Sequence, residues 1–173
     1  MIAPARGEAT VSEEQLASIR DNLCTLYREL DRDLARLGPI CELSGRCCRF
    51  QEYGHTLFIS EPEARLFFAD APLPVRPLDD GQSCPWQDAN NRCTARDARP
   101  FGCRIFFCDP VFDEIAPQLT ERYLGKLKQL ANQHGWSWNY APLHRHLQNA
   151  RAEGRLRIAA ATLHGDRNDD TSP

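Results

Sequence analysis

SEEQLASIRDNLCTLYRELDRDLARLGP, residues 12–39, carries the clearest structural signal in the chain. Ser12 with Gln15 is the capping-box pattern that starts a helix, and Gly38 before Pro39 is a common way to end one. Between them apolar residues recur every three or four positions, which lays a stripe along about seven turns. The stripe consists of Leu16, Ile19, Leu23, Leu26, Leu30, Leu34 and Leu37. We predict a long helix facing a core rather than a coiled coil, because the heptads are few.

The rest of the chain predicts further helices and little sheet. Ser60 with Glu63 repeats the capping box and opens a helix, with Leu66, Phe67 and Phe68 facing the core. The predicted helices span about 60–70, 110–133 and 143–150, and the predicted short strands span 55–59 and 136–140. The fold class expected is mainly α, with long helices that scaffold an irregular cysteine-rich loop region and at most short strands.

Composition predicts one compact domain. The chain has 173 residues, 42% hydrophobic and 26% charged. We place the domain at 11–164 and expect disordered ends at 1–10 and 165–173. Apolar runs are far too short for a membrane span, and a net charge of −3 argues against a nucleic-acid partner. Because the N-terminus lacks a signal-peptide core, we expect a cytoplasmic location.

Eight cysteines are the unusual feature, and seven of them fall within residues 41–108. In the reducing cytoplasm such a group indicates metal binding or catalysis before disulfides. Thiolates are soft ligands for zinc and for iron–sulfur clusters, and four suffice for either. The candidate metal ligands are Cys41, Cys47, Cys48, Cys84, Cys93, Cys103 and Cys108. Structural disulfides stay open as an alternative that requires an oxidising compartment.

The spacing favours an iron–sulfur cluster, first of all 4Fe-4S, over zinc. Zinc sites usually pair ligands as Cys-x2-4-Cys knuckles, and only Cys103 and Cys108 come near this spacing. The side chains of adjacent Cys47 and Cys48 would point to opposite faces of an extended chain. We therefore expect that one of them binds the metal while the other packs, or that the two bind different metals. Long loops that converge on one point suit a cluster whose iron corners face several directions. Zinc is the alternative cofactor.

Residues near the cysteines have two interpretations each. Cys24 flanks the apolar stripe and is interpreted as a small core residue outside the site. His55 is a candidate ligand or base, although a packing role is favoured. Arg49, Arg99 and Arg104 are candidates to bind the cofactor by neutralising a thiolate-bound cluster, with surface salt bridges as the alternative.

Four segments together carry a family resemblance: CELSGRCC (41–48), ISEPEA (59–64), CPWQDANNRC (84–93) and RPFGCRIFFC (99–108). In this order they resemble the YkgJ-type cysteine-cluster family, described as a zinc- or iron-chelating domain, over residues 41–110. The family's first element reads Cys-x2-Cys-x2-Cys-Cys, and Ser44 stands here at its second cysteine. The resemblance implies metal chelation by the remaining seven cysteines. A similar domain in flagellin lysine N-methylases implies an enzymatic alternative.

Three hypotheses of function follow. The first is a metal-binding protein whose cysteines chelate an iron–sulfur cluster, or zinc or iron, in a reaction not yet identified. The second is an enzyme that acts beside the metal centre, with an activity like that of a protein lysine methylase. The third is a structural zinc module for protein contacts, in which the metal contributes folding energy. The expected partner is a metal ion or cluster; no membrane or nucleic acid is expected, and the sequence identifies no protein partner.

Overall fold

The computed structural model describes residues 12–78 and 81–156 and is mainly helical within them. Its elements are α1 (Glu13–Leu37), a 3₁₀ turn (Arg46–Cys48), β1 (Phe58–Ser60), α2 (Glu61–Asp70), α3 (Phe101–Arg104), α4 (Pro110–Gln133), β2 (Tyr140–Pro142) and α5 (Leu143–Ala152). The predicted mainly-α class is confirmed, and the predicted disordered ends lie outside the described residues. No helix in the described part has both the length and the apolarity that crossing a membrane requires.

Helix α1 begins and ends as its sequence predicts. Ser12 Oγ accepts a hydrogen bond from the Gln15 N–H at 3.1 Å, and Gly38 ends the helix with a φ of 65°. Its buried face consists of Ile19, Leu23, Leu26, Tyr27, Leu30 and Leu34. The prediction for Cys24 is wrong, because this thiol is exposed: one residue past buried Leu23, the helix has turned by about 100° toward solvent.

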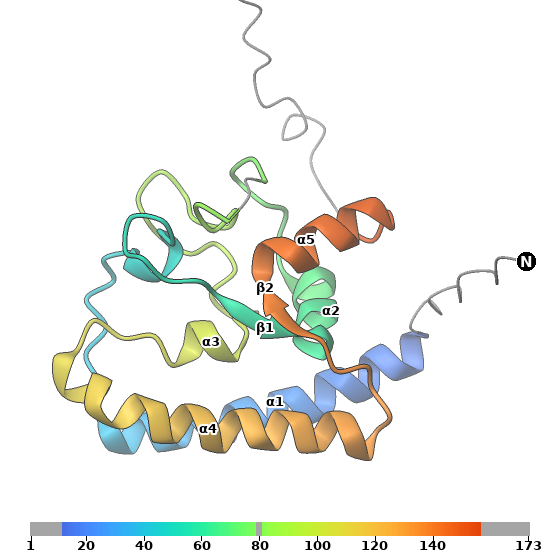
Figure 1. Cartoon of the computed structure of the whole chain (residues 1–173), viewed down its shortest axis with the longest axis horizontal. Helices are drawn as coiled ribbons and strands as arrows, with labels where there is room; N and C mark the ends of the chain where they lie inside the picture. Colours follow the sequence, from blue (N-terminus) through green and yellow to red (C-terminus); the bar gives the residue numbers. More distant parts are fainter. Residues whose placement is uncertain (1–11, 79–80, 157–173) are drawn as a thin grey trace, which may run out of the picture.

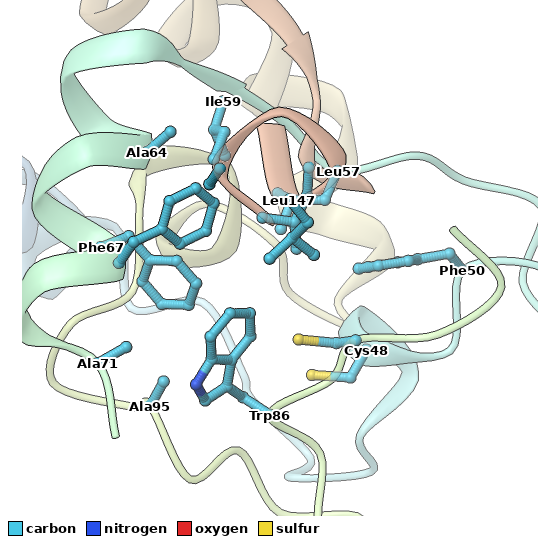
Figure 2. Close-up of a cluster of buried hydrophobic side chains, with 14 residues drawn as sticks. Cys48, Phe50, Leu57, Ile59, Ala64, Phe67, Ala71, Trp86, Ala95 and Leu147 are labelled. Atoms are coloured by element: carbon cyan, nitrogen blue, oxygen red, sulfur yellow. The ribbon is translucent and has the colours of Figure 1, made fainter. Parts of the chain in front are cut away.

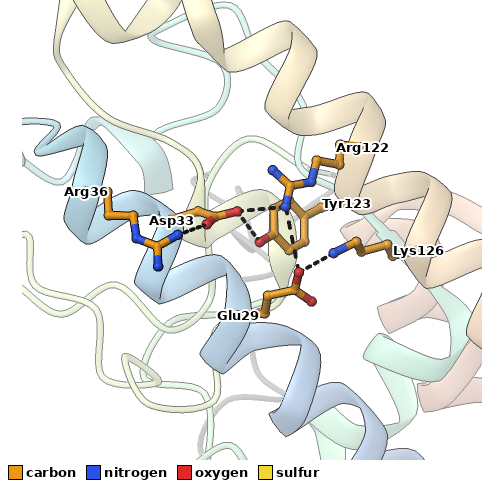
Figure 3. Close-up of polar contacts among 6 residues, drawn as sticks. All are labelled: Glu29, Asp33, Arg36, Arg122, Tyr123 and Lys126. Atoms are coloured by element: carbon orange, nitrogen blue, oxygen red, sulfur yellow. Dashed lines mark hydrogen bonds and ion pairs between the residues drawn. The ribbon is translucent and has the colours of Figure 1, made fainter.

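Helices α1 and α4 lie side by side and run in opposite directions (Figure 1). The buried face of α4 consists of Phe112, Leu119, Tyr123, Leu127 and Ala131. A polar cluster crosses the pair (Figure 3): the Tyr123 hydroxyl donates to Asp33 at 2.7 Å, and Arg122 pairs with the same carboxylate at 3.2 Å. Lys126 pairs with Glu29 beside them. The cluster fixes how the two long helices are aligned.

A small second layer packs on this helix pair. Strands β1 and β2 are antiparallel, with Ile59 opposite Ala141, and α2 and α5 both contact this ribbon. The strand predicted at 136–140 is therefore displaced, since pairing begins only at Tyr140. Trp138 instead stacks on the Tyr140 ring at 6.1 Å. The period-2 alternation of aromatic residues predicted a strand at 136–140. Backbone pairing with β1 instead determines that the strand begins at Tyr140.

Glu63 connects three elements from a fully buried position, with 2% of its surface exposed. Its carboxylate accepts hydrogen bonds from the Tyr27 hydroxyl of α1 at 2.8 Å and from the Phe101 N–H of α3 at 2.7 Å. The Ser60 N–H and hydroxyl also donate to it, at 3.0 and 2.7 Å. Burial, with Glu63 beside it, raises the pKa of Tyr27 well above its ordinary value. One carboxylate thus holds α1, α2 and α3 together.

Trp86 anchors the cysteine-bearing segments to the core. It is 1% exposed, packs edge-on against Phe67 at 4.5 Å, and donates from its indole N–H to the Pro72 carbonyl at 2.7 Å. Cys48 and Cys84 belong to the same apolar cluster, each with 5% of its surface exposed. Figure 2 shows Cys48 beside Trp86 at the edge of this cluster. The core therefore positions two of the candidate ligands directly.

His146 on α5 makes stability depend on pH. Its ring is buried, and Nε2 lies 3.1 Å from the Ile59 carbonyl. Burial lowers the pKa of His146, against weaker opposing effects of that carbonyl, Glu61 and Glu63. In the unfolded chain this histidine takes up a proton near pH 6.5, whereas in the folded chain it does so only at lower pH. Stability is therefore full above about pH 6.5 and decreases as the pH falls toward the lowered value.

We expect the urea midpoint of the wild type to drop between pH 7 and pH 5, and His146→Gln to flatten this dependence. A glutamine amide can still donate to the Ile59 carbonyl but does not titrate. His134→Gln is the matched control, because His134 is exposed at the end of α4. An equal slope for the wild type and His146→Gln would contradict the prediction.

Candidate functional site

All seven cysteines of residues 41–108 line one cavity of about 260 Å³. Cys47 and Cys48 come from the 3₁₀ turn, Cys84 and Cys93 flank a tight turn, and Cys103 lies on α3. Cys41 and Cys108 complete the set from segments next to α1 and α4. Cys24 is not part of the lining. The folded chain therefore brings together thiols that are up to 67 positions apart in sequence.

Adjacent Cys47 and Cys48 both face this cavity, with their sulfurs 3.9 Å apart. The expectation of opposite faces assumed an extended chain and is wrong, because the two residues lie in a 3₁₀ turn. Successive side chains of such a turn are about 120° apart, which leaves room for two neighbours to converge. Gly45 makes the turn possible by adopting a φ of 71° at its start.

Cys48 is the centre of an inner group of sulfurs. Its sulfur lies 3.9 Å from that of Cys47, and its carbonyl oxygen accepts the Cys84 N–H at 2.8 Å. Hydrogen bonding with Cys47, and with Cys84 and Cys93, raises the pKa of Cys48, whereas hydrogen bonding with Cys48 lowers the pKa of Cys47 and of Cys93. We call these four residues the inner group.

The turn between Cys84 and Cys93 closes through its own backbone and one aspartate. Gln87 pairs with Cys93 as an antiparallel bridge, and the Asp88 N–H donates to the Arg92 carbonyl at 2.9 Å. The Asp88 carboxylate also accepts from the Arg92 N–H at 2.7 Å. Residues 84–93 thus form a hairpin-like turn. The Cys84 N–H then donates to the Cys48 carbonyl at 2.8 Å, which docks the turn on the 3₁₀ segment.

The other three cysteines lie around the inner group. Burial, with the charges of nearby cysteine thiolates, raises the pKa of Cys103 well above its ordinary value. Cys41 is exposed, and Cys108 is half-buried with its sulfur 3.4 Å from the Ser44 hydroxyl. Ser44, at the family's second cysteine position, therefore contacts Cys108.

Of the three arginines predicted to face a cofactor, Arg99 lines the cavity, and its charge helps to lower the pKa of Cys47 and Cys93. Arg49 instead pairs with Glu52 at 2.8 Å. Arg104 pairs with Asp31 at 3.1 Å and lies over the Tyr27 ring, which ties α3 to α1. Sequence reasoning missed three further arginines of the lining, although each stands within three positions of a candidate cysteine. They are Arg46, Arg92 and Arg96.

His55 is packed rather than aimed at the cysteine cavity. Its ring lies 4.8 Å from that of Phe106, and Nε2 lies 3.4 Å from the Cys47 carbonyl. The same ring lines a second cavity of about 220 Å³, whose wall also includes Cys47 and Cys103. Aromatic and aliphatic side chains make up most of the remaining wall. Two cavities thus meet at the same pair of cysteines.

Within residues 12–78 and 81–156, no three His, Cys, Asp or Glu side chains are placed, as they stand, to hold a metal ion together. Within the inner group, the Cys47 and Cys48 sulfurs lie 3.9 Å apart. No protein-family model, curated protein or solved structure matches this chain. The resemblance to the YkgJ-type family therefore stays a prediction.

Proposed function

We propose that this chain is a cytoplasmic metal-binding protein in which long helices scaffold an irregular cysteine-rich region that chelates an iron–sulfur cluster, with zinc as the alternative metal. One observation carries the proposal: seven of the eight cysteines line one cavity. Free cysteines that only pack in a core have no reason to share one wall. Thiols gathered in this way are the donor set that zinc and iron–sulfur clusters take.

One pair of sulfurs already stands at the separation that such a group requires. Four thiolates at about 2.3 Å from zinc stand about 3.8 Å from one another, and the Cys47 and Cys48 sulfurs are 3.9 Å apart. Closing the inner group around a metal requires side-chain rotations and loss of the thiol protons. Arg99 at the cavity wall offsets the negative charge of the thiolates. A bound iron–sulfur cluster would supply electron transfer, and zinc would supply folding energy or Lewis acidity.

An enzyme acting beside the metal centre is the second candidate, and the second cavity favours it. Four residues line both this 220 Å³ cavity and the cysteine cavity: Cys47, Leu57, Cys103 and Phe106. Tyr140 and His55 provide polar atoms among its apolar side chains. A substrate held there would lie next to the metal ligands. Methyl transfer to a lysine is the reaction that the family resemblance suggests for such a pocket.

Metal analysis of anaerobically purified protein tests the proposal. For an iron–sulfur cluster we expect iron, acid-labile sulfide and a brown colour. A colourless protein with stoichiometric zinc is the result expected for the structural zinc module. Cys48→Ser should weaken metal binding by about 100-fold or more, because Cys48 is buried at the cavity wall with its sulfur 3.9 Å from that of Cys47.

The matched control is Cys24→Ser, because this thiol is exposed on α1 and absent from the cavity wall. Its metal content should equal that of the wild type. A wild type purified without metal, and unable to take up iron or zinc anaerobically, would contradict the proposed function. Equal metal loss in both variants would show that the set of ligands is wrong.

A further inference from the structure

The second cavity, of about 220 Å³, has a wall that the proposed metal centre does not explain. Most of its side chains are apolar, and four of them carry aromatic rings: His55, Phe58, Phe106 and Tyr140. Rings that only complete a core are buried, but Phe58 and Tyr140 are 41% and 37% exposed. Large apolar side chains gathered in this way around a cavity are typical of a ligand site.

The four rings form two pairs that come from separate parts of the chain. The His55 and Phe106 rings lie 4.8 Å apart with a tilt of 32°. The Phe58 and Tyr140 rings stack at 5.6 Å as diagonal neighbours across the β1–β2 ribbon, and Trp138 stacks on Tyr140 in turn. Aromatic surface at two places in the wall favours a flat ring as the ligand, because contacts between rings add to the gain from burial.

Packed backbone elements form this cavity. Helix α3 contacts β1 (Figure 1), and a Cβ at Gly102 of α3 would meet Cδ1 of buried Leu57 at 2.8 Å. Glycine therefore allows the close approach and leaves space at the wall, which Gly102 also lines. Leu57 is held from the other side, where its carbonyl accepts the Leu143 N–H at 2.8 Å. The cavity is thus part of the folded frame and needs no ligand to form it.

Volume and charge define the class of ligand. An apolar cavity of about 150 Å³ is large enough to bind benzene, so this cavity accommodates one ring or two fused rings. Among the described residues that line it, none is Asp, Glu, Lys or Arg, so the wall offers an ion no opposite charge. Thr56 and Tyr140 contribute hydroxyl groups, which can accept or donate one hydrogen bond to a substituent of the ring.

We propose that the second cavity binds a small neutral aromatic molecule of one or two fused rings, held against its two ring pairs. Four residues of the wall also line the cysteine cavity, Cys47 and Cys103 among them, so the bound ring lies next to the candidate metal ligands. The inference goes beyond the proposed metal binding and does not depend on it, because it rests on the cavity and its rings alone.

Isothermal titration calorimetry of the full chain with phenol, cyclohexanol and indole tests the proposal. Phenol should bind about 5-fold tighter than cyclohexanol, which carries the same hydroxyl on a saturated ring. Tyr140→Ala should weaken indole binding by about 10-fold, whereas Tyr140→Phe should retain it, because the ring forms the stack. Tyr53→Ala is the matched control, since Tyr53 is a tyrosine of similar exposure, 41%, outside both cavities.

Circular dichroism checks that each variant folds, and the comparison of phenol with cyclohexanol on the wild type does not depend on any variant. Equal affinity for these two probes, or no binding of indole, would overturn the proposal. So would tighter binding of n-butylammonium than of indole, since rings also attract cations and the cavity would then be assigned to an alkylammonium group. A chain that binds indole but neither iron nor zinc keeps this inference and loses the proposed function, and a metal-loaded chain that binds no aromatic probe gives the reverse result.

Discussion

Glu63→Gln should destabilise the folded chain by about 3 kcal/mol, although it changes the volume of the side chain very little. All four groups around the Glu63 carboxylate are donors: the Tyr27 hydroxyl, the Phe101 N–H, and the N–H and hydroxyl of Ser60. A carboxylate offers about four acceptor positions, whereas a glutamine amide replaces half of them with two N–H donors. At least one buried donor would then face another donor with no acceptor in reach.

Urea unfolding at pH 7, followed by far-UV circular dichroism, measures this loss. Glu61→Gln is the matched control on the same first turn of α2, since Glu61 forms a half-buried ion pair with Arg65. The control should cost less than about 1 kcal/mol, because the glutamine amide can still accept a hydrogen bond from Arg65. A loss of similar size in both variants would mean that the buried network contributes no more than this single ion pair.

Gly45→Ala should cost about 3 kcal/mol and should also reduce metal binding. Gly45 has a φ of 71°, and a Cβ built on it would lie 2.5 Å from the Asn91 carbonyl oxygen. The same Cβ would lie 2.5 Å from Gln87 Nε2, which donates to the Gly45 carbonyl at 3.0 Å. The added methyl group therefore pushes the 3₁₀ turn of Cys47 and Cys48 away from the turn that carries Cys84 and Cys93.

Gly54→Ala separates the backbone cost from the steric one. Gly54 has a similar φ of 63°, but a Cβ there would meet nothing within 4 Å. We expect a loss of about 1 kcal/mol and unchanged metal content. Unfolding in urea and metal analysis of both variants give the comparison. Equal stability and equal metal content in the two variants would contradict the close contact as the feature that aligns the inner group.

The helices were predictable because the information for them is local. The reciprocal bond between Ser12 and Gln15, the apolar spacing that follows, and Gly38 at the end all act within a few residues of one another. Helices α4 and α5 were predicted at nearly their observed bounds for the same reason. Strand β2 was displaced because its position depends on pairing with Phe58–Ser60, 80 or more positions earlier.

The sequence also identified the chemical type of the candidate site. Seven cysteines crowded into residues 41–108 indicated thiol ligands, and the fold brings all seven to the wall of one cavity. The sequence could not indicate the roles of individual arginines. Arg104 pairs with Asp31, and Arg49 pairs with Glu52, through side chains that only the folded chain orients. Nor could residue spacing show that Cys24 faces solvent.

By itself, then, the sequence determined the long helices and the supply of cysteine thiols, since both depend on residue type and on neighbours along the chain. Only the tertiary structure decided which sulfurs stand together. Cys47 and Cys48 converge because Gly45 permits a tight turn. The Cys84 N–H reaches the Cys48 carbonyl because Trp86 packs the turn of residues 84–93 against α2. Such contacts follow from how distant segments fill one core, and spacing along the chain does not encode distances across it.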